Sequence, residues 1–182
     1  SIERIAKPSA QIMEAKQKIL FQLGTQSFAN TNFEQALQYL NQSIAIGQYN
    51  RQTKADAYYW CGESYYRLNR MMEAARDFNA YLQLTTQPNN EMYALANYNL
   101  GYIAFHRKDY TQASNYFQKY IQLEKGENRT ALADAYNRIG DCHLNVRNFE
   151  EAKHNINAMV GQEMSENHWE TQESRATGYL SN

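Results

Sequence analysis

The sequence predicts an all-α, right-handed superhelix of about four helix pairs. Three observations support this fold class: glycines recur at a regular interval, an alanine follows each glycine at a fixed distance, and apolar residues keep helical spacing on both sides of short polar breaks. The glycines are Gly24, Gly62, Gly101 and Gly140, at intervals of 38, 39 and 39 residues. Because a fixed period of about 20–50 residues is typical of helical solenoids, we interpret the chain as a short array of repeats.

Each repeat contains two small residues framed by large ones. Twelve residues after each glycine stands an alanine, and four residues further stands a bulky apolar residue. Unit by unit these are Gly24, Ala36 and Leu40; Gly62, Ala74 and Phe78; Gly101, Ala113 and Phe117; and Gly140, Ala152 and Ile156. A glycine inside a helix costs about 1 kcal/mol relative to alanine, so local propensity does not explain it. We therefore predict that the two helices of each unit approach closely at these small residues.

Short polar breaks divide each unit into two antiparallel helices. They lie at Thr31-Asn32, Asn69-Arg70, Lys108-Asp109 and Arg147-Asn148. In three units the second helix opens with Asn or Asp followed three residues later by Gln or Glu, as in a capping box: Asn32 with Gln35, Asp109 with Gln112, and Asn148 with Glu151. Unit two has Arg70 at this place, so we expect its turn to be the least well capped.

The resulting helices follow in order along the chain. The first begins just after Pro8, where proline tolerates a helix start. Helices are expected over 10–29, 33–46, 54–68, 71–84, 91–106, 110–124, 129–145 and 149–160. We expect one solenoid domain over 1–182, with units at 16–50, 54–88, 91–126 and 129–161, an N-terminal extension over 1–15 and a partial or capping helix in 162–182.

The units resemble the tetratricopeptide repeat, whose signature is Trp-x2-Leu-Gly-x2-Tyr, then Ala-x3-Phe, then Pro. Unit two is the most similar, with Tyr58, Cys61, Gly62, Tyr65, Ala74 and Phe78 at these positions. The chain departs from the family in its longer period and in the missing closing proline. The segments 55–78 and 94–113 are also similar to tetratricopeptide proteins of the bacterial envelope, of the Tol-Pal-associated and large Bacteroidetes types. That likeness implies a periplasmic or envelope scaffold; without it the expected compartment is the cytoplasm.

Charge and hydropathy argue against several classes of partner. Lys and Arg total 18 against 19 Asp and Glu, and there is no run of like charges. Nucleic acid and anionic membrane surfaces are therefore not expected partners. No apolar run approaches the about 18–20 residues of a membrane span, so direct membrane insertion is not expected.

The sequence contains no arrangement typical of catalysis, metal binding or a cofactor. The four histidines lack ligand spacing, and there is no Gly-rich phosphate loop or nucleophile elbow. Cys61 and Cys142 lie in the first helices of units two and four, too far apart for a disulfide, and are expected to be free, mostly buried thiols. We therefore expect no enzyme, no metal and no cofactor.

The first helices carry aromatic residues beyond those that the helix-pair core needs. In unit three, Tyr98, Tyr102 and Phe105 lie at i, i+4 and i+7 along one face. The same offsets give Phe21, Thr25 and Phe28 in unit one, Tyr59, Glu63 and Tyr66 in unit two, and Asn137, Asp141 and Leu144 in unit four. The tetratricopeptide resemblance implies that this face lines a concave groove where ligands bind. The candidate partner-binding residues are Phe21, Tyr59, Glu63, Tyr98, Tyr102 and Asp141.

A packing role competes with a binding role at the i+7 position of these helices. The aromatic residues there can equally wedge between units: Phe28, Tyr66 and Phe105. Two functions remain. In the first, the chain is a scaffold that binds a peptide or partner segment in the aromatic groove. In the second, it is an architectural spacer or self-assembly segment of a longer repeat protein, with no groove ligand. Exposed tyrosines would favour the first. A receptor for chaperone tails is not expected, because the Lys and Asn residues of that clamp are absent from these offsets.

Overall fold

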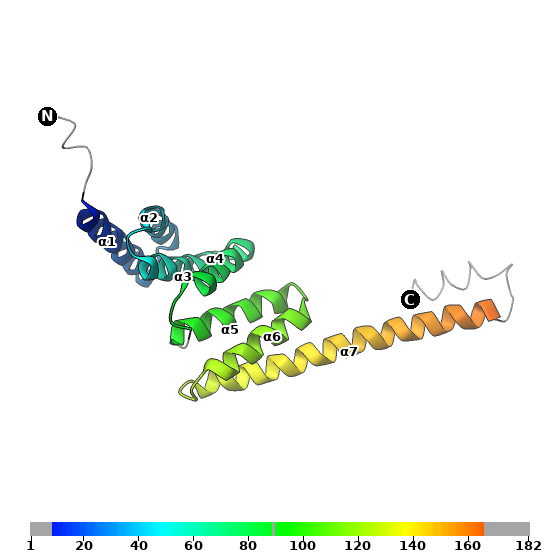
Figure 1. The fold of residues 1–182 in the computed structure, drawn as a ribbon. Helices are drawn as coiled ribbons and strands as arrows, with labels where there is room; N and C mark the ends of the chain where they lie inside the picture. Colours follow the sequence, from blue (N-terminus) through cyan, green and yellow to red (C-terminus); the bar gives the residue numbers. More distant parts are fainter. Residues whose placement is uncertain (1–8, 89, 166–182) are drawn as a thin grey trace.

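The computed structural model describes residues 9–88 and 90–165 (Figure 1). Within them seven α-helices occur and no strand, so the predicted all-α repeat fold is confirmed. The helices are α1 (Ala10–Ala29), α2 (Phe33–Ile46), α3 (Arg51–Arg67), α4 (Met71–Leu84), α5 (Glu91–His106), α6 (Tyr110–Leu123) and α7 (Arg129–Ser165). The first and last residues of α1 to α6 agree with the expected bounds to within three residues. Of the expected N-terminal extension over 1–15 and the partial or capping helix in 162–182, residues 1–8 and 166–182 lie outside the described residues.

Helices α1 to α6 form three successive hairpins (Figure 1). The two helices of each hairpin are connected by the same type of turn. Thr31, Asn69 and Lys108 adopt left-handed φ values of 59°, 59° and 64°. The N–H of the residue that follows each of them donates back to a carbonyl five residues earlier, at 2.8–3.0 Å. These closing hydrogen bonds compensate for a conformation that L-residues rarely adopt.

The helix caps follow the sequence signals. Asn32 Oδ1 accepts a hydrogen bond from the N–H of Gln35 at 3.2 Å, and Asp109 Oδ1 accepts one from Gln112 at 3.3 Å. Arg70 makes no side-chain cap and instead pairs with Glu73 at 3.1 Å. The second turn is thus the least well capped of the three, as predicted.

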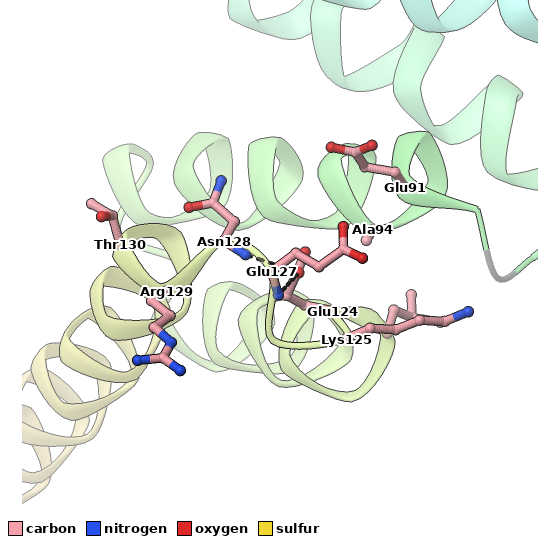
Figure 2. Close-up of a pocket in the computed structure, with 9 residues that line it drawn as sticks. Glu91, Ala94, Glu124, Lys125, Glu127, Asn128, Arg129 and Thr130 are labelled. Atoms are coloured by element: carbon pink, nitrogen blue, oxygen red, sulfur yellow. Dashed lines mark hydrogen bonds between the residues drawn. The ribbon is translucent and has the colours of Figure 1, made fainter.

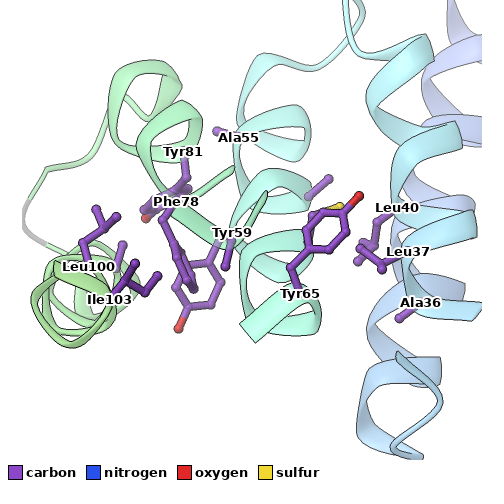
Figure 3. Close-up of a cluster of buried hydrophobic side chains, with 14 residues drawn as sticks. Ala36, Leu37, Leu40, Ala55, Tyr59, Tyr65, Phe78, Tyr81, Leu100 and Ile103 are labelled. Atoms are coloured by element: carbon purple, nitrogen blue, oxygen red, sulfur yellow. The ribbon is translucent and has the colours of Figure 1, made fainter. Parts of the chain in front are cut away.

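The glycines in the first three units sit against the large residues with which the sequence pairs them. A Cβ placed on Gly24 would lie 2.5 Å from Leu40 Cγ, one on Gly62 would lie 2.7 Å from Phe78 Cδ1, and one on Gly101 would lie 2.8 Å from Phe117 Cε1. No side chain fits in these spaces, which explains why glycine stands in the helices. Buried side chains then continue from Ala36 in α2 to Ile103 in α5, forming one core across successive hairpins (Figure 3).

The fourth unit differs from the expected hairpin. Helix α7 runs without interruption for 37 residues and extends away from the other helices (Figure 1). The turn expected at Arg147-Asn148 and the separate helix expected over 149–160 are therefore wrong. Nothing lies within 4 Å of a Cβ on Gly140, Ala152 is exposed, and Ile156 is 41% exposed.

Two contributions explain the straight helix. Continuing through Arg147 keeps the i→i−4 hydrogen bonds and avoids a left-handed residue, which costs about 1–2 kcal/mol. At the glycine, closing the hairpin would place Ile156 against Gly140, where units two and three place a phenylalanine against their glycines. Moreover, no described element lies beyond the second half of α7 to cover it. The local preference for a helix therefore prevails over the turn signal.

Candidate partner-binding surface

The first candidate, Tyr59, is a core residue. Only 3% of its surface is exposed, and its ring makes edge contacts with Phe78 and Tyr81 at centroid distances of 5.7 and 5.4 Å (Figure 3). The expectation that Tyr59 belongs to an exposed stripe is therefore wrong. Tyr81, from the second helix of the same unit, explains the error, because it adds an aromatic neighbour that the glycine and alanine pattern does not reveal. Burial, together with nearby Glu63, raises the pKa of Tyr59 above its ordinary value.

Glu63 is half-buried and connects α3 to α5. Its Oε1 accepts hydrogen bonds from Tyr59 Oη at 3.0 Å and from Asn99 Nδ2 at 2.6 Å. Both donors are uncharged, and no ion pair of Glu63 is formed within residues 9–88 and 90–165. Glu63 thus remains a candidate for attracting a basic group.

Tyr98 and Tyr102 are half-buried on α5, and their hydroxyls meet on one carboxylate oxygen of α7. Tyr98 donates to Asp134 Oδ2 at 2.7 Å, and Tyr102 donates to the same oxygen. The two rings lie edge to face with centroids 5.2 Å apart. Burial and the Asp134 hydrogen bond raise the pKa of Tyr102 to about 12 and that of Tyr98 above its ordinary value. Both hydroxyls are therefore protonated donors at neutral pH.

Asp134 and Arg138 belong to this surface although the sequence offsets did not select them. Arg138 Nη2 lies 3.3 Å from Asp141 Oδ2, and Arg138 Nε lies 3.9 Å from Asp134 Oδ1. The guanidinium carbon of Arg138 is 5.8 Å from the centroid of the Phe105 ring. Asp134 precedes Asn137, the first offset used in unit four, by three residues, so one more position on the same helical face would have found it.

The remaining aromatic candidates pack mainly against protein. Phe21 is half-buried against the core of the first hairpins. Phe28 meets Trp60 of the next unit at a centroid distance of 5.0 Å, so it wedges between units. The structure thus gathers Tyr98, Tyr102 and Asp141 around Asp134, while Phe21 and Glu63 lie on earlier first helices.

A separate pocket of about 690 Å³ opens at the connection between α6 and α7 (Figure 2). Its lining includes Glu91, Lys125 and Glu127 but none of the six candidate residues. Glu124 Oε1 there accepts hydrogen bonds from the N–H groups of Glu127 and Asn128 at 3.1 and 3.3 Å, so this carboxylate caps the start of α7. Glu124 in the pocket lining therefore has a structural role in the connection between α6 and α7.

Two further observations concern metal binding and membrane insertion. No group of three or more His, Cys, Asp or Glu side chains among residues 9–88 and 90–165 is arranged to hold a metal ion. Among the helices described here, none is both long enough and apolar enough to cross a membrane. What the surface offers is half-buried aromatic rings and carboxylates that can accept hydrogen bonds and basic groups.

Three closed helix pairs followed by one long helix define a helical repeat protein. Family models described as tetratricopeptide repeat match residues 21–91, 94–126 and 133–159, which is more than half of the chain. The chain belongs to the tetratricopeptide repeat family. The third matched segment lies entirely within α7, so the repeat pattern persists in sequence where the hairpin is open.

Solved structures share the fold. The crystal structure of MamA is similar with a TM-score of 0.54 and 20% identity, over 80% of this chain and 86% of that one. The nearly identical TPR-like repeats from a Podosopora anserina protein of kinesin light chain type match with a TM-score of 0.54 and 12% identity, over 81% and 75%. No curated protein matches the chain. These likenesses show the shared fold, and membership of the tetratricopeptide repeat family indicates a protein–protein interaction scaffold.

Proposed function

We propose that the chain is a scaffold that binds a peptide or a segment of another protein along the first helices of its units. The contacts are Phe21 on α1, Glu63 on α3, Tyr98 and Tyr102 on α5, and Asp141 on α7. Tyr59 contributes only through its hydrogen bond to Glu63. No catalytic activity is part of the proposal, and the likeness to envelope proteins favours a bacterial periplasmic location.

One observation carries the proposal. The carboxylates of Glu63, Asp134 and Asp141 stay partly exposed on α3 and α7, and the half-buried rings of Tyr98 and Tyr102 lie between them in the order of the helices. Half-buried tyrosines combine a large apolar face with a polar tip, which suits peptide binding. A ligand with apolar side chains and a basic end near Glu63 and Asp141 would satisfy both kinds of group.

We expect the Tyr98→Ala, Tyr102→Ala double variant to weaken binding of a partner at least tenfold, because central aromatic contacts are worth about 2 kcal/mol or more. Asp141→Lys should weaken it less, and the effect should fade as salt screens the charge. The partner is first identified by crosslinking the native protein, and affinities are then measured by titration calorimetry. The thermal melt of each variant reports whether it is folded.

Met72→Ala is the matched control, because Met72 is a large apolar residue, 65% exposed, on the second helix of unit two. It should leave affinity unchanged. Wild-type affinity of the double tyrosine variant, in a chain that still melts cooperatively, would contradict groove binding.

Self-assembly is the second candidate function, and the surface of α7 favours it. Of the eleven exposed large apolar residues in the described part of the chain, seven lie on α7, among them Phe149 at 67% exposure. A cluster of this kind on one element commonly marks a contact surface. Concentration-dependent sedimentation that Phe149→Asp abolishes, with no effect of the tyrosine variants on any partner, would support this alternative instead.

A further inference from the structure

We infer that Asp134, Asp141 and Phe105 form a guanidinium-binding site, which the chain's own Arg138 fills in the absence of a partner and which an arginine of the partner takes over. The first part stands on the geometry alone. The last step rests on the proposed scaffold function. These three residues are called the guanidinium cradle below.

The cradle combines the groups that recognise arginine in proteins. Two carboxylates lie beside the Arg138 guanidinium, with Nη2 at 3.3 Å from Asp141 and Nε at 3.9 Å from Asp134, and the Phe105 ring centroid lies 5.8 Å from its central carbon. Arginine favours such sites because its planar ion pairs with carboxylates and stacks on aromatic faces. The site is more than a group of acids, because a guanidinium already occupies it.

Arg138 fits the cradle incompletely. Its Nε is buried and has no hydrogen-bond partner among the described residues, since the Asp134 oxygen at 3.9 Å is too distant to accept a bond. Asp134 cannot turn its other oxygen toward Arg138, because Tyr98 and Tyr102 both donate to it. A buried donor without a hydrogen-bond partner costs free energy. A guanidinium that makes better hydrogen bonds to the cradle would therefore bind it more favourably than Arg138 does.

The cause of the poor fit is the attachment of Arg138 to α7. Arg138 lies four residues after Asp134 and three before Asp141, so its side chain reaches both acids from its own helix. A guanidinium from another chain approaches from outside the helix and can direct two parallel N–H groups at the carboxylate of Asp141, the stronger arrangement. Such a ligand would displace Arg138 into solvent, where its charge is well hydrated.

The test uses N-acetyl-arginine amide as the probe and the full chain, with binding followed by NMR shifts of the α7 amides. In Arg138→Ala the cradle is vacated, and we expect the probe to bind at least fivefold more tightly than to wild type. Adding Asp134→Asn to that variant should remove the gain. N-acetyl-citrulline amide, which has nearly the same shape but no charge, should bind neither protein.

Arg147→Ala is the matched control. Arg147 also forms an i,i+4 pair on α7, with Glu151 at 2.8 Å, but its side chain is 75% exposed. Its removal should not change probe binding. If Arg138→Ala does not fold, Arg138→Met keeps the apolar stem beside Phe105 and serves in its place.

Equal affinity of the probe for wild type and the Arg138 variant would overturn the inference, and so would equal binding of the citrulline probe. Because no partner protein is used, either result would leave the scaffold function standing. Conversely, loss of the scaffold function would leave a positive result with the probe intact.

Discussion

Gly101→Leu is expected to lower the free energy of unfolding by about 1–3 kcal/mol, the usual cost of overpacking a filled core. A Cβ on Gly101 alone would already lie 2.8 Å from the Phe117 ring, so a leucine side chain must push α5 and α6 apart. Ala113→Leu should act in the same direction, because Ala113 is fully buried in the same unit. Chemical denaturation monitored by circular dichroism measures both changes.

Gly140 supplies the matched control within the same repeat pattern. Nothing lies within 4 Å of a Cβ there, so Gly140→Leu should stabilise α7 by up to about 1 kcal/mol through helix propensity alone. A loss of stability at Gly140 as large as that at Gly101 would contradict the open fourth unit. An unchanged midpoint for Gly101→Leu would show that the third pair does not pack at this position.

Asp134→Ala is expected to destabilise the contact between α5 and α7 by about 1.5–3 kcal/mol, the range for hydrogen bonds to a charged group. The substitution removes the carboxylate that accepts hydrogen bonds from the Tyr98 and Tyr102 hydroxyls. In the wild type, burial and these hydrogen bonds raise the pKa of both tyrosines, so both hydroxyls are donors that lose their acceptor. Hydrogen exchange of the first turns of α7 reports the local change.

Asp141→Ala is the comparison for this effect, because Asp141 is more exposed and forms only an ion pair with Arg138 on its own helix. Such pairs contribute about 0.3–0.5 kcal/mol, so its loss should be small. If the two aspartate variants exchange at the same rate, the tyrosine hydroxyls do not depend on Asp134.

The six helices of the closed pairs were predictable because each signal there is local or strictly periodic. Asn32 and Asp109 cap their own helices, and Gly62 and Gly101 mark the contact with Phe78 and Phe117 at a constant separation in sequence. Unit four carries the same signals without the same packing. Whether a turn forms at Arg147-Asn148 depends on how much apolar surface the two helices would bury against each other. The sequence period does not predict that amount.

The candidate partner-binding surface was less predictable than the fold. Tyr59 was predicted to lie outside the core because the repeat pattern does not include Tyr81. The Tyr81 ring packs against Tyr59 from the second helix of the unit, a tertiary contact that the pattern does not predict. Asp134 escaped notice because its importance comes from two tyrosines 36 and 32 residues earlier. Residue offsets on one helix placed Tyr98 and Tyr102 side by side, as the structure has them, but they did not identify the carboxylate that accepts their hydrogen bonds.

Helix α7 is one continuous helix that follows three closed pairs and leaves its second half uncovered by the other described helices. The distance between spin labels at Ala133→Cys and Ala158→Cys tests it most directly, because both sites are exposed and the native cysteines are buried. The sites are 25 residues apart, so a continuous helix at about 1.5 Å per residue separates their backbones by about 37 Å. A closed fourth hairpin would bring them to about 10 Å, the spacing of packed helices, and that result would contradict the account.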